Sequence, residues 1–324
     1  MIMKIGIVGP VHQKGLDIFQ DHQFNFVEIT DTNPSNLIEK LKDVDGVVLR
    51  TAPLDNNVLE ECSKIKIVSR HGVGYDNVDI NYLNKSNIAL AITGTANAVS
   101  VAEHVMTFFL HLTKNINISD ELTKKGDFQN KGQLPNFFEL YQKNVLILGF
   151  GRIGQAVAQR CLGFEMNVYV YDPFVQESII QTKGCQPITK EEGLRISDYI
   201  SMHLPLNEKT RNFIDTNEFE RMKKNCILVN TARGGVVNEQ SLYKALIEKK
   251  IAGTGLDVFD QEPPAIDNPL FGLSNALLTP HNAALTLECR IRMAVESCEN
   301  VVFFLKQKEK LNKNNVINIE NINV

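Results

Sequence analysis

The sequence has no tryptophan, no C-x-x-C pair and no excess of positive charge. Its six cysteines are scattered and most lie in apolar runs, a pattern typical of small buried thiols in a reducing compartment. We therefore expect a cytoplasmic protein without a metal site. A formal net charge of −4 argues against nucleic acid or an anionic membrane surface as the main partner.

Long apolar runs are also missing, since none approaches the ~20 residues of a membrane span. The opening residues, 3–9, have the pattern of a first strand and lack the apolar stretch of a signal peptide. The hydrophobic share of 43% is ordinary for a globular chain, and 324 residues are enough for two domains with separate cores.

A glycine motif follows the apolar run 145–148. Gly149, Gly151 and Gly154 fit G-x-G-x-x-G between a predicted strand and a predicted helix. In this motif the first glycine permits the tight turn, the second admits a pyrophosphate, and the third lets the helix approach the strand. The helix N-terminus then presents free N–H groups to the phosphates.

An acidic residue completes this dinucleotide pattern. Asp172 ends the next predicted strand, 18 residues after Gly154 (172 − 154), close to the usual spacing of ~20. A carboxylate there accepts hydrogen bonds from both ribose hydroxyls and repels a 2′-phosphate. The sequence therefore predicts NAD as the cofactor, in preference to NADP.

Two α/β segments are expected from the alternation of strands and helices, which predicts two doubly wound parallel sheets. The first segment, residues 1–97, has strands predicted at 4–8, 24–29, 46–50, 65–69 and 88–92, and helices at 14–20, 33–41, 57–61 and 79–85. The second, from residue 144 to about 280, has six strands predicted near 145–149, 167–171, 198–201, 226–230, 253–258 and 276–279.

The connecting segments suggest how these parts are joined. Ser100–Glu103 forms a capping-box pattern that starts a helix reaching about residue 112, and we interpret His104 and His111 on it as structural or solvated histidines. Residues 115–143 are polar and irregular with interspersed aromatics, which suggests an arm that packs on a second subunit. A helix is predicted at 287–306, and the tail 312–324 is expected to add an edge strand.

Polar groups follow several predicted strands, where open α/β sheets bind ligands. Arg233 could grip a carboxylate with two parallel hydrogen bonds, and His281 could act as an acid–base group with a carboxylate partner. Position alone does not choose that partner among Asp257, Asp260 and Glu262. In the first segment Gly72 and Gly74 follow a strand and could form an anion-binding nest, near Arg50 at the end of another strand.

Taken together, these blocks resemble the D-2-hydroxyacid dehydrogenases, in the branch with 3-phosphoglycerate dehydrogenases and hydroxypyruvate reductases. The resemblance covers nearly the whole chain and is carried by the motifs at 72–79, 100–104, 149–154, 203–206, 230–235, 257–263 and 279–281. It implies a Rossmann NAD-binding domain inserted into a flavodoxin-like substrate domain. The expected boundaries are 1–97 and 289–324 for the substrate domain and 98–288 for the NAD-binding domain, with a dimerisation arm at 115–143.

The resemblance also assigns the site. It implies Arg233, Glu262 and His281 as the catalytic residues, with Glu262 orienting His281. Cofactor contacts are expected at Gly149, Gly151, Arg152, Ile153, Gly154, Asp172, His203, Pro205, Thr231, Ala232 and Asp257, the last on the nicotinamide amide. The substrate contacts are expected at Arg50, Arg70, His71, Val73 and Gly74, with the N–H groups of Val73 and Gly74 on the carboxylate.

The activity implied is NAD-dependent interconversion of a D-2-hydroxy acid and its 2-oxo acid by a homodimer. The substrate is a small anionic acid, and 3-phosphoglycerate with 3-phosphohydroxypyruvate suits the positive charge of Arg50 and Arg70. The alternatives are a glyoxylate or hydroxypyruvate reductase, a phosphite-type dehydrogenase, and an NAD-sensing corepressor-like protein. Ala284 stands where this family commonly has glycine, the arm lacks the frequent tryptophan, and no regulatory domain for amino-acid feedback is expected.

Overall fold

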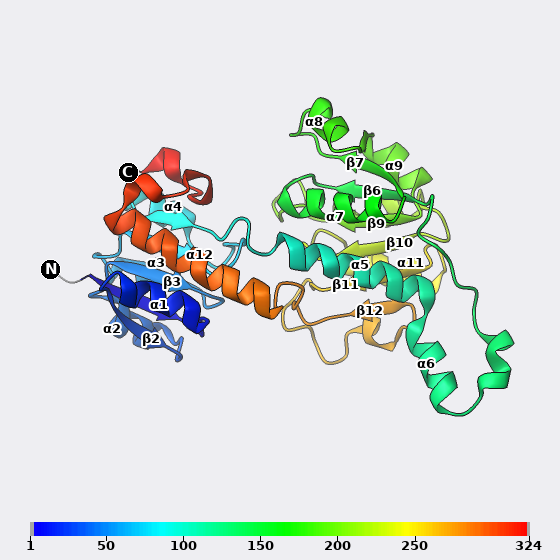
Figure 1. The fold of residues 1–324 in the computed structure, drawn as a ribbon, viewed down its shortest axis with the longest axis horizontal. Helices are drawn as coiled ribbons and strands as arrows, with labels where there is room; N and C mark the ends of the chain where they lie inside the picture. The colour runs from blue at the N-terminus through cyan, green and yellow to red at the C-terminus, as the bar shows by residue number, and fades with distance from the viewer. Residues whose placement is uncertain (1–2, 323–324) are drawn as a thin grey trace. The chain divides into compact units, whose positions relative to one another are not determined.

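A computed structural model describes residues 3–322 as two compact units (Figure 1). The first unit comprises the chain up to Asn97 together with the part from Leu285 onward, and the second comprises Ala98–Ala284. The second unit ends at Ala284, slightly before the expected boundary at 288. Helix α12 (Leu287–Lys306), capped by Thr286, packs on the first unit, so the residues that lead into it belong there.

The first unit is built on a five-stranded parallel sheet in the order β2-β1-β3-β4-β5. Its strands are β1 (Lys4–Val8), β2 (Asn25–Ile29), β3 (Gly46–Leu49), β4 (Ile67–Arg70) and β5 (Ala89–Ala91). This is the flavodoxin-like order expected from the resemblance, and the doubly wound fold is confirmed.

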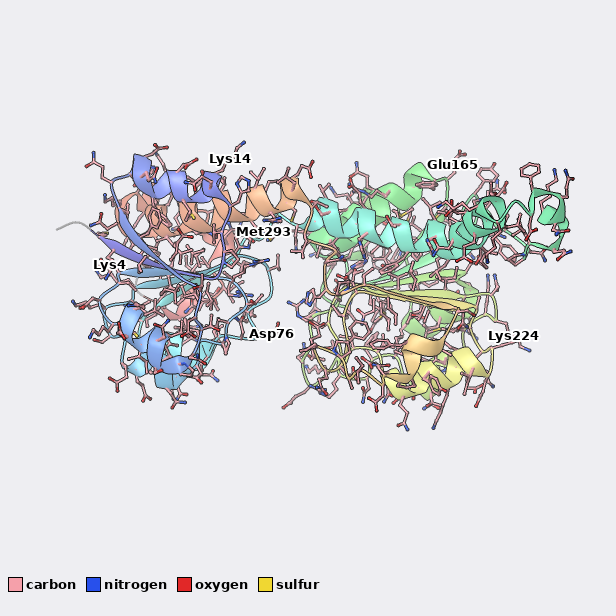
Figure 2. The ribbon with its side chains drawn as sticks, turned by 90° about the horizontal axis from the view of Figure 1, so that it is seen from below. Lys4, Lys14, Asp76, Glu165, Lys224 and Met293 are labelled. Atoms are coloured by element: carbon pink, nitrogen blue, oxygen red, sulfur yellow. The ribbon has the colours of Figure 1, made fainter. Side chains whose placement is uncertain are left out.

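Helices cover both faces of this sheet. Helices α1 (Gln13–Asp21) and α12 cover one face, while α2 (Pro34–Leu41), α3 (Asn56–Glu60) and α4 (Ile80–Lys85) cover the other. Met293 of α12 is buried, whereas Lys14 of α1 is exposed (Figure 2). Alternate residues of β1 divide between the two cores, with Ile5 and Ile7 in one and Val8 in the other.

The second unit contains a seven-stranded parallel sheet in the order β12-β11-β10-β9-β6-β7-β8. Six strands agree with those predicted: β6 (Asn144–Leu148), β7 (Asn167–Tyr171), β9 (Tyr199–Met202), β10 (Ile227–Asn230), β11 (Gly253–Leu256) and β12 (Ala276–Leu278). The short β8 (Gln186–Pro187), beside β7 at the edge, was not expected. The strand order reverses at β6, where a doubly wound sheet binds a dinucleotide.

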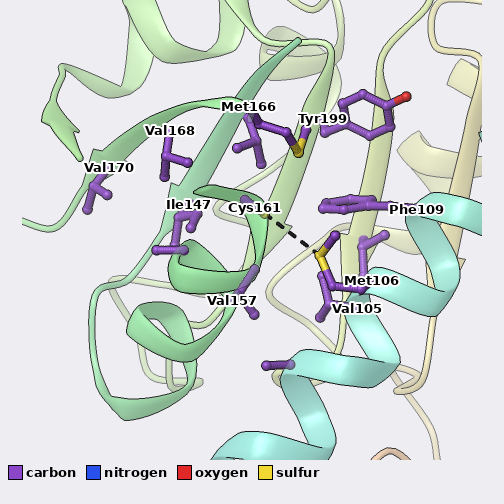
Figure 3. Close-up of a cluster of buried hydrophobic side chains, with 14 of the residues drawn as sticks. Val105, Met106, Phe109, Ile147, Val157, Cys161, Met166, Val168, Val170 and Tyr199 are labelled. Carbon is purple, nitrogen blue, oxygen red and sulfur yellow. Dashed lines mark hydrogen bonds between the residues drawn. The ribbon is translucent and has the colours of Figure 1, made fainter. Parts of the chain in front are cut away.

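The core of this unit also lies on both faces of the sheet. Helices α5 (Ala98–Lys114) and α7 (Arg152–Gly163) pack on one face, where Phe109 meets Tyr199 and the Cys161 thiol contacts the Met106 sulfur (Figure 3). The other face is covered by α9 (Lys190–Ile196), α10 (Thr216–Phe219) and α11 (Glu239–Ile247). Helix α8 (Glu177–Thr182) lies beside β8.

Two connecting segments differ from their predicted structure. The segment 115–143 is not irregular throughout, because it contains α6 (Ile116–Lys124) and the 3₁₀ turn Phe128–Gln133, and it projects from the second unit (Figure 1). The tail forms 3₁₀ turns at Lys308–Lys310, Lys313–Asn315 and Ile319–Asn321, and not an edge strand. Only an isolated antiparallel bridge joins Val316 to Ala91, while residues 323–324 of that prediction lie outside the described part. No helix between residues 3 and 322 is long and apolar enough to cross a membrane.

Candidate active site

The glycine turn after β6 is tightly constrained. Gly149 has φ +96°, and a Cβ on it would lie 2.6 Å from the carbonyl oxygen of His203. A Cβ on Gly154 would lie 2.1 Å from the carbonyl oxygen of Gly149. Side chains at these two positions would push β6 from β9 and α7 from the turn, so the close approach needs glycine.

The N-terminus of α7 is open to a ligand. Gly151 is its N-cap and no side chain caps the helix, while a Cβ on Gly151 would meet nothing within 4 Å. Free N–H groups and the positive end of the helix dipole suit a pyrophosphate at this point. Arg152 and Ile153 open the helix beside it.

Asp172 stands at the end of β7, directly beside this turn. Its Oδ2 accepts a hydrogen bond from the N–H of Phe150 at 2.7 Å, and its Oδ1 accepts one from the N–H of Phe174 at 2.9 Å. The carboxylate is thus fixed next to the glycines with lone pairs left for ribose hydroxyls. This geometry fits the adenosine half of NAD.

Further predicted cofactor residues lie at the ends of β9 and β10. Burial lowers the pKa of His203 to about 3, so its imidazole is neutral, and its Nε2 lies 2.8 Å from the Ser201 hydroxyl. Pro205 follows on the same loop. Thr231 has a buried hydroxyl oxygen with no hydrogen-bond partner in the described chain, and Ala232 lies next to it. A buried polar atom without a partner is what a site built for a ligand would leave.

His281 and Glu262 form a pair. The imidazole Nδ1 lies 2.7 Å from Oε2 of Glu262, and Oε1 accepts a hydrogen bond from the N–H of Phe259 at 3.1 Å. A carboxylate can only accept here, so Nδ1 carries the proton and Nε2 is left for a substrate oxygen. His281 has φ +50°, a left-handed conformation that a non-glycine residue adopts only where its surroundings hold it.

Asp257 is buried and holds the loop on which His281 stands. Its Oδ1 accepts hydrogen bonds from the Thr279 hydroxyl at 2.6 Å and the Asn282 N–H at 2.8 Å. Its Oδ2 accepts one from the Ala283 N–H at 2.9 Å. This carboxylate therefore holds the loop through the Thr279 side chain before His281 and through two backbone N–H groups after it.

Asp260 connects the loops of Arg233 and Glu262. Its Oδ1 accepts a hydrogen bond from the N–H of Gly235 at 2.6 Å, and a Cβ on Gly234 would lie 1.8 Å from the carbonyl oxygen of Phe259. Burial raises the pKa of Glu239, whose carboxylate accepts from the N–H of Asp260. The position of Arg233 relative to Glu262 is thus set by backbone contact between two loops of one unit.

Arg233 itself is held by the turn after β10. Its Nη1 donates to the carbonyl of Ala232 at 2.6 Å, and its own carbonyl accepts from the Asn230 side chain at 2.9 Å. Asn230 was not expected to matter, and it ties this turn to the strand that precedes it.

The family model for the D-isomer specific 2-hydroxyacid dehydrogenase NAD binding domain matches residues 106–283, more than half of the chain. The chain belongs to this family. The match confirms the family expected from the sequence and NAD as its cofactor. It covers the glycine turn, Asp172, Arg233, Glu262 and His281 together.

Several relatives and solved structures are similar to this chain over most of its length. A glyoxylate reductase of Korarchaeum cryptofilum is 35% identical over 93% of this chain and 92% of its own. A D-3-phosphoglycerate dehydrogenase of Methanocaldococcus jannaschii is 35% identical over 99% of this chain, which spans only 60% of that protein's length. The crystal structure of an Aquifex aeolicus D-lactate dehydrogenase with NAD and lactic acid has a TM-score of 0.83 at 27% identity, covering 97% of this chain and 98% of its own.

The predicted substrate residues of the first unit lie around one loop. Gly72 has φ +153°, and the N–H groups of Val73 and Gly74 have no acceptor within residues 3–322, so they are available to an anion. Asp76, marked in Figure 2, follows this loop and is exposed.

Arg70 contacts the backbone of this loop and of the neighbouring strand end. Its guanidinium is buried, with Nε donating to the carbonyl of Gly74 at 2.8 Å and Nη1 to the carbonyl of Leu49 at 2.7 Å. These hydrogen bonds hold the loop against the end of the sheet. They also stabilise the cation, because a buried guanidinium needs such acceptors. For Arg50, by contrast, the described part of the structure shows no such carbonyl acceptors.

His71, the third member of this group, is neutral. Burial lowers its pKa to about 4, and the nearby Arg50 and Arg70 act in the same direction. Its Nε2 is buried without a hydrogen-bond partner in the described part of the chain.

The substitution at Ala284 fits the structure. This residue is not among those with positive φ, so the backbone there does not require glycine. Between residues 3 and 322, no group of three or more His, Cys, Asp or Glu side chains is arranged to hold a metal ion.

Proposed function

We propose that this protein is an NAD-dependent dehydrogenase that interconverts a D-2-hydroxy acid and its 2-oxo acid. The observation that carries the proposal is the His281–Glu262 pair, at 2.7 Å, on the same sheet edge as a glycine turn shaped for a dinucleotide. Family membership supports it.

In oxidation, Nε2 of His281 takes the proton of the substrate hydroxyl as the C2 carbonyl forms. NAD, when bound, supplies the acceptor for the hydride that leaves C2. Glu262 holds the imidazole in the tautomer that leaves Nε2 free, and Arg233 binds the carboxylate and polarises the reacting oxygen. In reduction, the imidazolium returns the proton to the carbonyl oxygen.

The test is consumption of NADH with glyoxylate, hydroxypyruvate, pyruvate and 3-phosphohydroxypyruvate, alongside the variant His281→Ala. We expect turnover of at least one acid, with a loss of about 10³-fold or more in kcat for the variant. Binding of NADH without turnover of any acid would contradict the proposal and favour a cofactor-sensing protein.

For the substrate we infer a preference for an acid with a second anionic group, such as 3-phosphohydroxypyruvate. The free guanidinium of Arg50 at the end of β3 supports this choice. Arg50→Ala should lower kcat/KM for the phosphorylated acid by about tenfold more than for glyoxylate. An unchanged ratio would remove the preference and leave a glyoxylate or hydroxypyruvate reductase.

We further propose that the protein is cytoplasmic and forms a homodimer through the arm at 115–143. All six cysteines are free and buried, which supports a reducing compartment. The arm's exposed apolar side chains support a second subunit as its partner.

A further inference from the structure

One partly buried network in the second unit reaches from α5 to the loop of His281. His104, on α5, places Nε2 3.0 Å from the hydroxyl oxygen of Thr279, directly after β12. The same hydroxyl lies 2.6 Å from Oδ1 of Asp257. The Phe108 ring packs edge-on against the imidazole, with the ring centres 4.7 Å apart, and fixes its orientation.

The directions of these hydrogen bonds follow from the charge of Asp257. An ionised carboxylate has no proton to give, so the Thr279 hydroxyl donates to it. The hydroxyl oxygen is then the acceptor for His104, whose Nε2 must carry a proton. Burial lowers the pKa of His104, against the opposing effect of Asp257, so a neutral imidazole with Nε2–H is the form that fits.

Asp257 links the His104–Thr279 contact to the loop that carries His281. It is 1% exposed, and its oxygens receive the N–H groups of Asn282 and Ala283, the two residues after His281. The N–H of His281 donates to the carbonyl of Thr279 at 3.1 Å, so Thr279 contacts His281 through its backbone and Asp257 through its hydroxyl. Its backbone and its hydroxyl act on the same short segment.

We propose that His104 is a positioning residue for His281, acting through the Thr279 hydroxyl and the Asp257 carboxylate. The helix α5 thereby fixes the loop in which His281 takes its left-handed conformation. The catalytic consequence rests on the proposed dehydrogenase function, while the structural link does not. His104 touches neither the reacting atoms nor the His281 ring.

The experiment compares two matched pairs of variants in the full-length protein. Thr279→Val removes the hydroxyl and keeps the shape, and Thr279→Ser restores it. His104→Leu removes the donor, and His104→Gln keeps an N–H near the position of Nε2. Each protein is measured for amide hydrogen exchange in the peptide that contains residues 281–284, for kcat, and for NADH affinity.

We expect Thr279→Val and His104→Leu to speed exchange at Asn282 and Ala283 by about tenfold or more and to lower kcat by about tenfold. Thr279→Ser and His104→Gln should recover most of both losses, and NADH affinity should change by less than about threefold. The double variant His104→Leu/Thr279→Val should lose no more than Thr279→Val alone, because both act in one chain of hydrogen bonds.

Three results would overturn the proposal. Exchange and kcat could remain at the wild-type level in His104→Leu. His104→Gln could lose as much kcat and exchange protection as His104→Leu, which would show that packing, and not the hydrogen bond, is the cause. The losses of kcat in His104→Leu and in Thr279→Val could add in the double variant. If the wild type turns over no 2-oxo acid, the proposed function fails, while hydrogen exchange still decides the link between α5 and the loop.

Discussion

Three carboxylates come from one short segment after β11 and have three different partners. Glu262 contacts the His281 imidazole, Asp260 the N–H of Gly235 in the Arg233 turn, and Asp257 the backbone after His281. Position in the sequence did not distinguish them, because all three follow the same strand end. Their roles depend on which loop each oxygen reaches, and only the folded backbone decides that.

Glu262→Gln should lower kcat by about 10³-fold in oxidation. Glu262 accepts from two donors, Phe259 N–H and His281 Nδ1–H. The amide has one acceptor oxygen, so whichever donor receives it, the other faces an NH₂ group. If that donor is His281, its proton moves to Nε2, where the substrate's proton must be accepted.

The measurement is kcat in both directions with NADH affinity as a control. Glu262→Asp keeps two acceptors at a shorter reach and should lose less than the glutamine variant. Equal losses in the two variants would show that charge and hydrogen bonding at this position do not matter to the imidazole.

Asp172 is expected to make the protein prefer NADH over NADPH. Its carboxylate lies beside the glycine turn and would repel a 2′-phosphate, so kcat/KM should favour NADH over NADPH by more than about tenfold. Asp172→Ala should narrow this gap mainly by weakening NADH, since it also removes the acceptor of the Phe150 N–H. Steady-state kinetics with both cofactors test it, and equal use by the wild type would refute it.

At the scale of elements, the sequence predicted the strands that carry the site because each is a short apolar run bounded by a turn. It missed β8, which is only two residues long and makes few contacts. It did not predict α6, because the segment 115–143 was interpreted from its many polar residues as irregular, and no residue of that helix is buried. The sequence predicted a structural or solvated His104 but not its contact with Thr279, because a lone histidine on an apolar helix does not reveal what it faces.

Gly234→Ala tests the contact between the loops of Arg233 and Glu262. The added methyl group would meet the Phe259 carbonyl oxygen at 1.8 Å, so one loop must move. We expect a loss of stability of about 1–3 kcal/mol together with a fall in kcat of about tenfold or more. Urea unfolding and steady-state kinetics measure the two effects.

The matched control is Gly163→Ala at the end of α7, where a Cβ would meet nothing within 4 Å. It should be neutral or stabilising by up to about 1 kcal/mol and should leave kcat unchanged. Similar losses in both variants would mean that the loop contact has no special importance.

For the whole molecule, acid should weaken folding through His71. The pKa of this buried histidine is lowered to about 4, mainly by burial, from the usual 6.5. Below 6.5 the unfolded chain binds a proton that the folded protein rejects, so the free energy of unfolding falls as the pH drops toward 4.

Between about pH 7.5 and about pH 5 the contribution of this one group should be about 2 kcal/mol. Urea unfolding at the two pH values, for the wild type and His71→Asn, isolates it. The variant should lose less stability between the two pH values than the wild type. An equal loss in both would show that His71 is protonated in the folded protein.

The arm gives the last prediction, which concerns assembly. Its exposed apolar side chains have no contact within their own unit that would bury them, and α6 has no buried residue. They are Ile116, Ile118, Phe128, Phe137, Phe138 and Tyr141, each more than 40% exposed. Such a surface is costly in water unless another chain covers it.

We expect a dimer at about 10 µM in sedimentation velocity, and a dissociation constant raised about 100-fold or more in Phe128→Ser/Phe138→Ser. Ile266→Ser is the matched control, because Ile266 is 97% exposed and lies outside the arm. It should leave the dimer intact, so a loss of association there would point to general surface hydrophobicity. A wild-type monomer at that concentration would show that the arm serves another purpose.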